Sequence, residues 1–161
     1  MAVKAQMDNL ESDSRTLHVA VIGAGPQGKR TIGAIGELEH LDLAAVVDLD
    51  EEVLSSLSLP ETTGRHTSLE SAAIDRRLDM VCIATNGPSH RTLTEQAVNF
   101  GVRRILVEKP MACSVDDCAA MMELCRERGV RLAVNQGRRL DPFYRWLGEQ
   151  IRSGEWGETR S

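Results

Sequence analysis

The 161 residues include 24 acidic and 19 basic side chains, which give a formal net charge of −5, and 42% of the residues are hydrophobic. This length suits one domain with a buried core and excludes a larger two-domain architecture. The negative charge argues against a nucleic-acid partner, and no apolar run reaches the roughly 20 residues that span a bilayer. Because residues 1–15 are polar and lack the apolar core of a signal peptide, we expect a disordered tail there and a cytoplasmic protein.

From residue 16 to residue 157 the sequence alternates between strand and helix patterns. We expect strands at 17–22, 43–47, 65–67, 80–84, 104–107 and 131–134. We expect helices at 27–38, 51–57, 69–77, 90–100, 115–128 and 142–152. Several strands are continuous Val, Ile and Leu runs, which are typical of parallel sheets covered on both faces. The pattern predicts a single α/β domain with a doubly wound, mostly parallel sheet, the Rossmann class.

The helix at 115–128 has the clearest boundaries. Ser114 can cap its first turn with Asp117 three residues on, and Gly129 ends it. Helical spacing predicts one apolar stripe, made of Val115, Cys118, Ala119, Met122 and Cys125. The four cysteines of the chain have no CxxC spacing, so we expect no metal site.

A glycine-rich run, Gly23-Ala24-Gly25-Pro26-Gln27-Gly28, lies between the first strand and the first helix. In a dinucleotide-binding loop the first glycine permits a tight turn, the second lets the backbone approach a pyrophosphate, and the third lets helix and strand pack closely. The following helix N-terminus attracts phosphate. Lys29 and Arg30 come next and are expected to point to solvent.

Asp48 ends the second predicted strand, 20 residues after Gly28. An acid at this distance can accept hydrogen bonds from the hydroxyls of the adenosine ribose. The carboxylates that follow, Asp50, Glu51 and Glu52, would repel a 2′-phosphate, which favours NAD over NADP. The alternative is that Asp48 merely caps the helix that begins near Glu51.

Two further segments follow strands and are therefore expected beside the ligand crevice. Thr85 and Asn86 follow the fourth strand, with His90 at the start of the next helix, although these are also good turn and cap residues, and a histidine in a first helical turn is usually a surface or packing residue. Glu108-Lys109-Pro110 follows the fifth strand, where the charge of Lys109 could polarise a hydroxyl or carbonyl group. Pro110 restrains the backbone there, with either a trans or a cis bond.

Together these segments resemble the glucose-fructose oxidoreductase, inositol dehydrogenase and rhizopine-catabolism (Gfo/Idh/MocA) family. The likeness covers the chain after residue 16, and its most specific part is Val-Glu-Lys-Pro-Met-Ala at 107–112. It also includes the glycine run, Ala84-Thr85 with His90, Asn135 with Arg138-Arg139 and Pro142, and Ile151-Arg-Ser-Gly-Glu-Trp-Gly at 151–157. Asn86 departs from the pattern, since proline is common at that position.

The resemblance implies a cofactor site made of Gly23, Gly25, Pro26, Gln27, Gly28, Asp48, Thr85, Asn86, His90, Glu108 and Lys109. It also implies that Glu108 and Lys109 form the active-site motif, with Lys109 touching the nicotinamide ribose and assisting the substrate. Family members continue into a second domain that carries a catalytic Asp and His pair, and residues 158–161 would be its start. We therefore expect no turnover from this chain alone.

The favoured function is the nucleotide-binding half of an NAD-dependent oxidoreductase that moves hydride to or from a sugar- or cyclitol-like hydroxyl group. The alternative is a non-enzymatic NAD-binding sensor or partner subunit. A methyltransferase using S-adenosylmethionine shares the glycine loop, but Glu-Lys-Pro argues against it. We expect a polyol or sugar as substrate and no nucleic-acid or membrane partner. An uncovered apolar surface would favour a homo-oligomer.

Overall fold

The computed structural model describes residues 15–158. Of the tail predicted at 1–15, all but Arg15 lies outside the described residues. Residues 159–161, predicted as part of the start of a second domain, also lie outside them.

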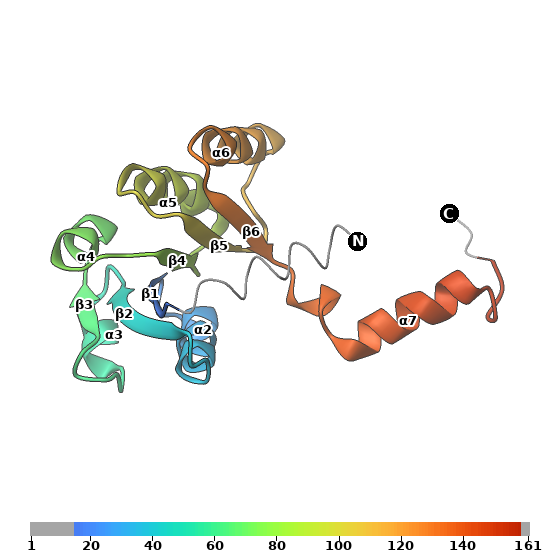
Figure 1. Cartoon of the computed structure of the whole chain (residues 1–161), viewed down its shortest axis with the longest axis horizontal. Helices are drawn as coiled ribbons and strands as arrows, with labels where there is room; N and C mark the ends of the chain where they lie inside the picture. The colour runs from blue at the N-terminus through green and yellow to red at the C-terminus, as the bar shows by residue number, and fades with distance from the viewer. Residues whose placement is uncertain (1–14, 159–161) are drawn as a thin grey trace.

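Six strands form one parallel sheet in the order β3-β2-β1-β4-β5-β6 (Figure 1). The strands are β1 (Leu17–Ile22), β2 (Leu41–Val47), β3 (Gly64–His66), β4 (Met80–Ile83), β5 (Arg104–Glu108) and β6 (Arg131–Asn135). The helices are α2 (Pro26–Gly36), α3 (Glu51–Ser56), α4 (Leu69–Asp75), α5 (Gly87–Asn99), α6 (Val115–Glu127) and α7 (Pro142–Ser153), with a 3-10 turn, η1 (Gly137–Arg139), before α7. Every predicted strand and helix is present, and the doubly wound fold is confirmed.

The helices lie in two layers around the sheet. Helices α2 and α3 cover one face, and α4, α5 and α6 cover the other (Figure 1). Successive residues of β1 point to opposite faces of the sheet. Val21 packs with Ile35 of α2, whereas Ile22 belongs to the core beneath α4 to α6. This two-sided burial explains the continuous apolar runs in the strands.

The strand order reverses beside β1, whose neighbours are β2 and β4. The chain leaves β1 toward α2 and leaves β4 toward α5, on opposite faces of the sheet. Such a reversal opens a crevice at the carboxyl ends of the strands, which is where ligands of open α/β sheets bind.

Helix α6 begins as predicted but turns a different face to the core. The Ser114 hydroxyl accepts the Asp117 N–H at 3.0 Å and so caps the helix. The buried residues are Met121 and Cys125, whereas Val115, Ala119 and Met122 are exposed. The predicted stripe was therefore wrong in three of its five members, because the helix meets the sheet through a face about one residue away.

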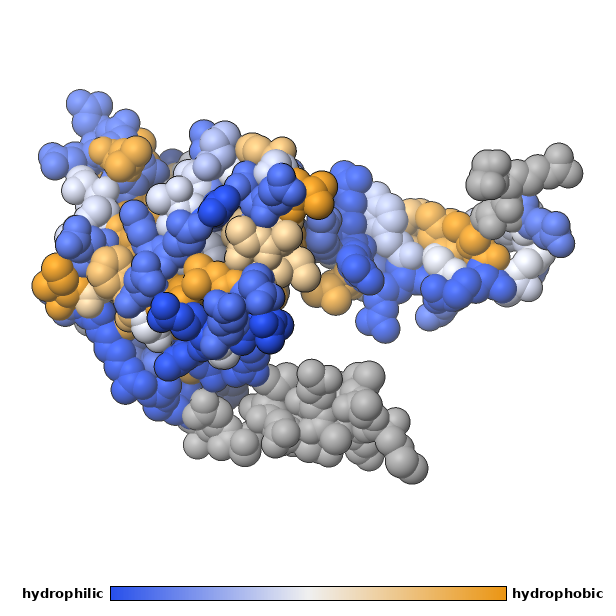
Figure 2. Space-filling model, turned by 90° about the horizontal axis from the view of Figure 1, so that it is seen from above, coloured by the Kyte–Doolittle hydropathy of each residue, from blue (hydrophilic) through white to orange (hydrophobic). Residues whose placement is uncertain are grey.

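Helix α7 projects from the sheet as an arm (Figure 1), and none of its residues is buried. Asp141 caps it by accepting the Phe143 N–H at 2.8 Å, and Gly154 ends it with a φ of 74°. Figure 2 shows apolar side chains on this arm, whose exposed large side chains include Phe143, Trp146 and Ile151. Within residues 15–158, no helix has both the length and the apolarity needed to cross a bilayer.

Candidate functional site

The glycine loop joins β1 to α2, and the surroundings of its three glycines, Gly23, Gly25 and Gly28, differ. Gly23 has a φ of 90°, and a Cβ there would lie 2.9 Å from the Ala84 carbonyl oxygen. A Cβ on Gly28 would lie 1.8 Å from the Gly23 carbonyl oxygen, so α2 packs against the loop only with glycine there. A Cβ on Gly25 would meet nothing within 4 Å. Packing within the protein therefore explains Gly23 and Gly28 but leaves space open above Gly25.

Asp48 connects the end of β2 to this loop. One carboxylate oxygen accepts the Ala24 N–H at 2.7 Å, and the other accepts the Asp50 N–H at 3.1 Å. A carboxylate offers about four acceptor positions, so two remain for other donors. The helix cap that could have explained Asp48 belongs to Asp50, which accepts the N–H groups of Glu52 and Val53. The capping alternative for Asp48 is therefore wrong.

A cavity of about 710 Å³ opens between these two features and the segment after β4. Of the predicted site residues, five line it: Gly23, Gly25, Asp48, Thr85 and Asn86. Among the described residues that form its wall there is no lysine or arginine. Arg65, on the adjoining β3, directs its guanidinium group to the carbonyl oxygens of Leu54 and Leu57. Within residues 15–158, the cavity wall thus contains the Asp48 carboxylate and no cationic side chain.

The wall also contains residues that the sequence did not single out, namely Thr67, Ser68, Ser89, Thr92, Leu93 and Gln96. Two features of the sequence could have identified these residues. Thr67 and Ser68 follow β3 and so lie at the carboxyl edge with the other loops. Ser89, Thr92 and Gln96 have the spacing of one helical face. Ser89 is fixed in place, since its hydroxyl lies 2.7 Å from the Thr85 hydroxyl and donates to the Asn86 carbonyl oxygen at 2.8 Å.

His90 is 1% exposed and is not among the residues that line the cavity. Its Nε2 is 3.1 Å from the Thr85 carbonyl oxygen, and its Nδ1 is 3.0 Å from the Pro110 carbonyl oxygen. The imidazole thereby links the loop after β4 to the loop after β5, and both of its nitrogens face backbone oxygens.

The Glu108-Lys109-Pro110 segment lies at the end of β5, outside the wall of the cavity. Glu108 is 8% exposed and accepts a hydrogen bond from the Asn135 amide at 2.5 Å, whereas Lys109 is exposed. The Lys109–Pro110 peptide bond is cis. Burial, and to a lesser degree the Glu108 carboxylate, raise the pKa of the Cys82 thiol to about 12. Pro26, Gln27 and Gly28, at the start of α2, also lie outside the wall.

The sequence pattern of an oxidoreductase family with an NAD-binding Rossmann fold (Gfo/Idh/MocA) matches residues 17–136. The chain belongs to this family. The match extends from β1 through β6 and includes the glycine loop, Asp48 and the segments after β4 and β5.

Curated relatives include the D-apiose dehydrogenase of Paraburkholderia graminis, 32% identical over 139 residues, and the inositol 2-dehydrogenase 3 of Saccharopolyspora erythraea, 30% identical over 146 residues. These alignments cover 86% and 88% of this chain but 37% and 42% of the relatives. Among solved structures, GenD2 from gentamicin A biosynthesis in complex with NAD is similar with a TM-score of 0.81 and 29% identity, over 88% of this chain and 40% of that one. The chain thus spans about two-fifths of the length of the proteins that it matches.

Proposed function

We propose that the chain binds NAD(H) and acts as the nucleotide-binding half of a dehydrogenase for a sugar- or polyol-like substrate. The observation that carries this proposal is the Asp48 carboxylate, held at 2.7 Å by the Ala24 N–H at the tip of the glycine loop. Two sugar and cyclitol dehydrogenases among the relatives support the substrate class. The cytoplasmic location and the homo-oligomer expected from the sequence stay predictions.

The residues around the cavity fit a dinucleotide. The space above Gly25, beside the N-terminus of α2 with its Pro26 and Gln27, can receive the pyrophosphate. The free acceptor positions of Asp48 can receive the adenosine ribose hydroxyls. A cavity of about 710 Å³ is within the usual range for cofactor sites.

The charge of the cavity favours NAD over NADP. A 2′-phosphate carries about −1.5 to −2 charges at neutral pH. It would be placed beside Asp48, with Glu51 and Glu52 in the next helical turn and no cationic wall residue among those described. Titration of the chain with NADH and NADPH, followed by the fluorescence of the reduced nicotinamide, tests this point. Tighter binding of NADPH would contradict it.

For catalysis we propose that Lys109 carries the chemistry on this side of the crevice. When bound, NAD would supply a hydride acceptor for the hydroxyl-bearing carbon of the substrate, whose hydroxyl group would lose its proton in the same oxidation. Lys109 is exposed at the carboxyl edge of the sheet, where its ammonium group can hold the nicotinamide ribose and polarise the substrate hydroxyl. Glu108, restrained by Asn135, contributes its charge beside it.

We give His90 a positioning role instead of a direct cofactor contact. With both ring nitrogens directed at backbone carbonyl oxygens, it holds Thr85 and the Pro110 loop at a fixed separation. In this way His90 sets the distance between the cavity wall and Lys109.

Two ligands of different length test the assignment of Lys109. ADP contains the adenosine ribose but no nicotinamide ribose, so Lys109→Met should weaken NADH binding and leave ADP binding unchanged. Asp48→Asn should weaken both, and Lys29→Met serves as the charge-matched control. Equal loss of NADH and ADP binding in Lys109→Met would remove Lys109 from the nicotinamide end.

The sensor alternative shares the cofactor contacts and differs in turnover. We expect the 161-residue chain to bind NADH but to show no NAD-dependent oxidation of inositol, because His90 is committed to backbone oxygens and Lys109 lacks a histidine partner among the described residues. Sustained turnover would contradict this expectation and exclude the sensor.

A further inference from the structure

The cavity beside Asp48 extends beyond the residues that the sequence predicted for the cofactor. The strands that border it lie in the order β3-β2-β1-β4, and about 4.8 Å separates neighbouring strands. The glycine loop follows β1, Asp48 follows β2, and Thr67 and Ser68 follow β3. A ligand whose pyrophosphate lies at the glycine loop and whose ribose lies at Asp48 therefore continues, in the same direction, toward the end of β3.

Two helices complete the cavity wall at this end. Helices α4 and α5 lie next to each other on one face of the sheet (Figure 1), and the wall includes Leu69 of α4 and both Leu93 and Gln96 of α5. Gln96 comes seven residues after Ser89, which places it about 10 Å farther along α5 from the loop after β4. This part of the cavity, the β3 end, is lined by Leu49, Thr67, Leu69, Leu93 and Gln96.

The apolar side chains of the β3 end can hold a flat ring. Leu49 comes directly after Asp48 and is 91% exposed, although it is an apolar residue in the wall of a cavity. It precedes α3, whereas Leu93 belongs to α5, and these two helices cover opposite faces of the sheet. Leu49 and Leu93 therefore border the cavity from two sides. A ring placed between them would cover apolar surface that water now contacts, which is favourable.

One side chain at this end has unused hydrogen-bonding groups. Within residues 15–158 the side-chain amide of Gln96 has no hydrogen-bond partner, and the residue is exposed in the cavity wall. The hydroxyl group of Ser68, by contrast, is engaged, since it accepts the Ser71 N–H at 3.1 Å and caps α4. A glutamine amide offers a carbonyl acceptor and an NH₂ donor. Gln96 can therefore contact a ring that presents a donor and an acceptor side by side.

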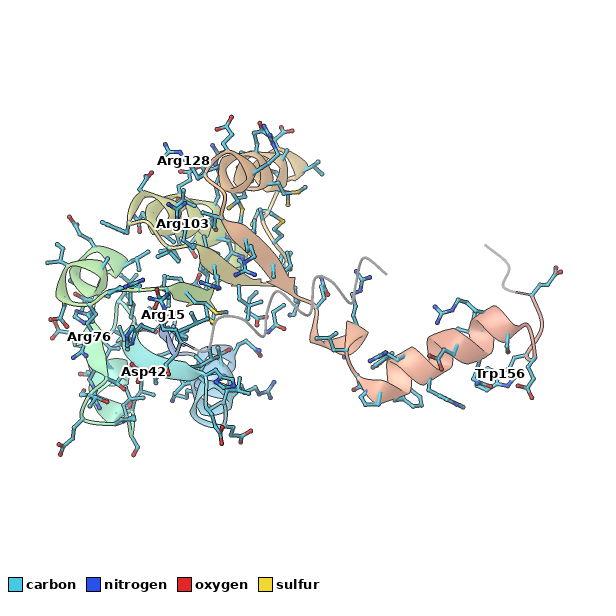
Figure 3. The ribbon with its side chains drawn as sticks, viewed as in Figure 1. Arg15, Asp42, Arg76, Arg103, Arg128 and Trp156 are labelled. Carbon is cyan, nitrogen blue, oxygen red and sulfur yellow. The ribbon has the colours of Figure 1, made fainter. Side chains whose placement is uncertain are left out.

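Helix α5 holds Gln96 at a defined position. At the start of the helix, both ring nitrogens of His90 contact backbone carbonyl oxygens. Beyond its end, Arg103 donates a hydrogen bond to the carbonyl oxygen of Arg128, at 2.7 Å, and both residues are labelled in Figure 3. Because α5 is anchored at both ends, the amide of Gln96 meets a ligand from a fixed backbone position, which selective recognition requires.

We propose that Gln96 determines the base specificity of the site, by binding the 6-amino group and N7 of adenine while Leu49 and Leu93 contact the two faces of the ring. This inference rests on the proposed binding of NAD(H), and it assigns the β3 end of the cavity to the adenine base. The carbonyl oxygen of Gln96 accepts from the 6-amino group and its NH₂ group donates to N7, a pairing that glutamine makes with adenine. Hypoxanthine has a carbonyl oxygen in place of the 6-amino group, so it presents two acceptors on this edge and loses one of the two hydrogen bonds.

Calorimetric titration of the 161-residue chain with ADP and with IDP, whose base is hypoxanthine, tests the proposal. The wild type should bind ADP about 5- to 150-fold more tightly than IDP, the range over which such a bidentate pair discriminates between bases. Gln96→Met keeps the length of the side chain and removes both polar atoms. It should bring the two affinities to within about twofold of each other, chiefly by weakening the binding of ADP. Gln150→Met, on α7 and outside the cavity wall, is the control and should keep the wild-type ratio.

The ratio of the two affinities separates recognition of the base from a structural role of Gln96. A variant that only distorts α5 would weaken ADP and IDP equally and leave their ratio unchanged, and circular dichroism shows whether each variant is folded. Equal binding of ADP and IDP by the wild type, an unchanged ratio in Gln96→Met, or the same change of ratio in the control would overturn the role of Gln96 and leave the proposed function standing. Absence of ADP binding would also overturn this inference, and absence of NADH binding as well would overturn the proposed function.

Discussion

The carboxylate of Asp48 accepts a hydrogen bond from the backbone N–H of Ala24 at 2.7 Å, and this contact ties the second strand to the glycine loop. The contact fixes the carboxylate in the wall of the cavity of about 710 Å³, with acceptor positions still available. The packing of the glycine loop and the proposed cofactor binding thus depend on the same side chain. For variants of Asp48, both the stability of the protein and its affinity for NADH must therefore be measured.

Asp48→Asn should raise the Kd for NADH about 10- to 100-fold, because hydrogen bonds to a charged group contribute about 1.5–3 kcal/mol. The measurement is fluorescence titration with NADH, together with a thermal melt. Asp42→Asn, on the same strand at its other end, is the control and should bind as the wild type does. Unchanged affinity in Asp48→Asn would contradict the ribose assignment.

Alanine at Gly25 and at Gly28 should have opposite effects on stability and binding. Gly25→Ala should fold with an unchanged Tm but bind NADH at least tenfold more weakly, because the methyl group would enter the space left for the pyrophosphate. Gly28→Ala should lose about 3 kcal/mol of stability or more, since its Cβ would collide with the Gly23 carbonyl oxygen. Gly33→Ala, on the exposed face of α2, is the control. Wild-type NADH affinity in Gly25→Ala would place the pyrophosphate elsewhere.

Cys82 should resist alkylation in the folded protein. With a pKa of about 12, its thiolate fraction at pH 8 is on the order of 10⁻⁴, and the side chain is buried. Iodoacetamide should modify the exposed Cys113 first, as read by peptide mass spectrometry. Glu108→Gln should leave Cys82 unmodified, because burial is the larger cause of the shift. Rapid labelling of Cys82 in the native state would show that the site opens.

Asp79 should make stability depend on pH at the acid end. Burial alone would raise its pKa, but the His18 N–H and the nearby Arg15 and Arg77 outweigh burial and hold the pKa below its ordinary value of 3.8. A depressed carboxyl pKa contributes stability above about pH 4, and that contribution is lost as the pH falls through the folded-state pKa.

Asp79→Asn should therefore lower the free energy of unfolding at pH 7 by about 1–3 kcal/mol and reduce its slope below pH 4. Urea denaturation between pH 3 and pH 7 measures both quantities. Asp42→Asn, an exposed partner of His18, should change neither by more than about 0.5 kcal/mol. An acid slope that is the same in Asp79→Asn and in the wild type would assign the pH dependence to other groups.

The order of strands and helices could be predicted from the sequence because every strand except β3 contains a run of apolar residues and each helix has its own cap or breaker. Which face of a helix is buried could not be predicted as well. In α6, Met121 and Met122 are adjacent and equally apolar, and only the position of the sheet decides that Met121 is buried.

The candidate site could likewise be predicted only in part. Asp48 could be found from its distance to the glycines, since both follow neighbouring parallel strands. The partners of His90 could not be found, because they are backbone oxygens of Thr85 and Pro110 that no side-chain pattern records. A smaller cavity lined by Arg15, Arg76, Arg77, Arg103 and Arg104 could not be found either, because these residues are scattered along the chain and meet only in the folded protein.

The arm formed by α7 contains the side chains that give the protein its intrinsic tryptophan fluorescence. Both tryptophans of the chain, Trp146 and Trp156, are on or directly after this helix, with ring centroids 5.7 Å apart, and the single tyrosine, Tyr144, is there as well. Near-ultraviolet excitation of tryptophan therefore samples the arm and not the sheet. A shift in emission on mixing with another molecule will register contact with the arm, while melting of the sheet will be visible only to a backbone signal such as circular dichroism.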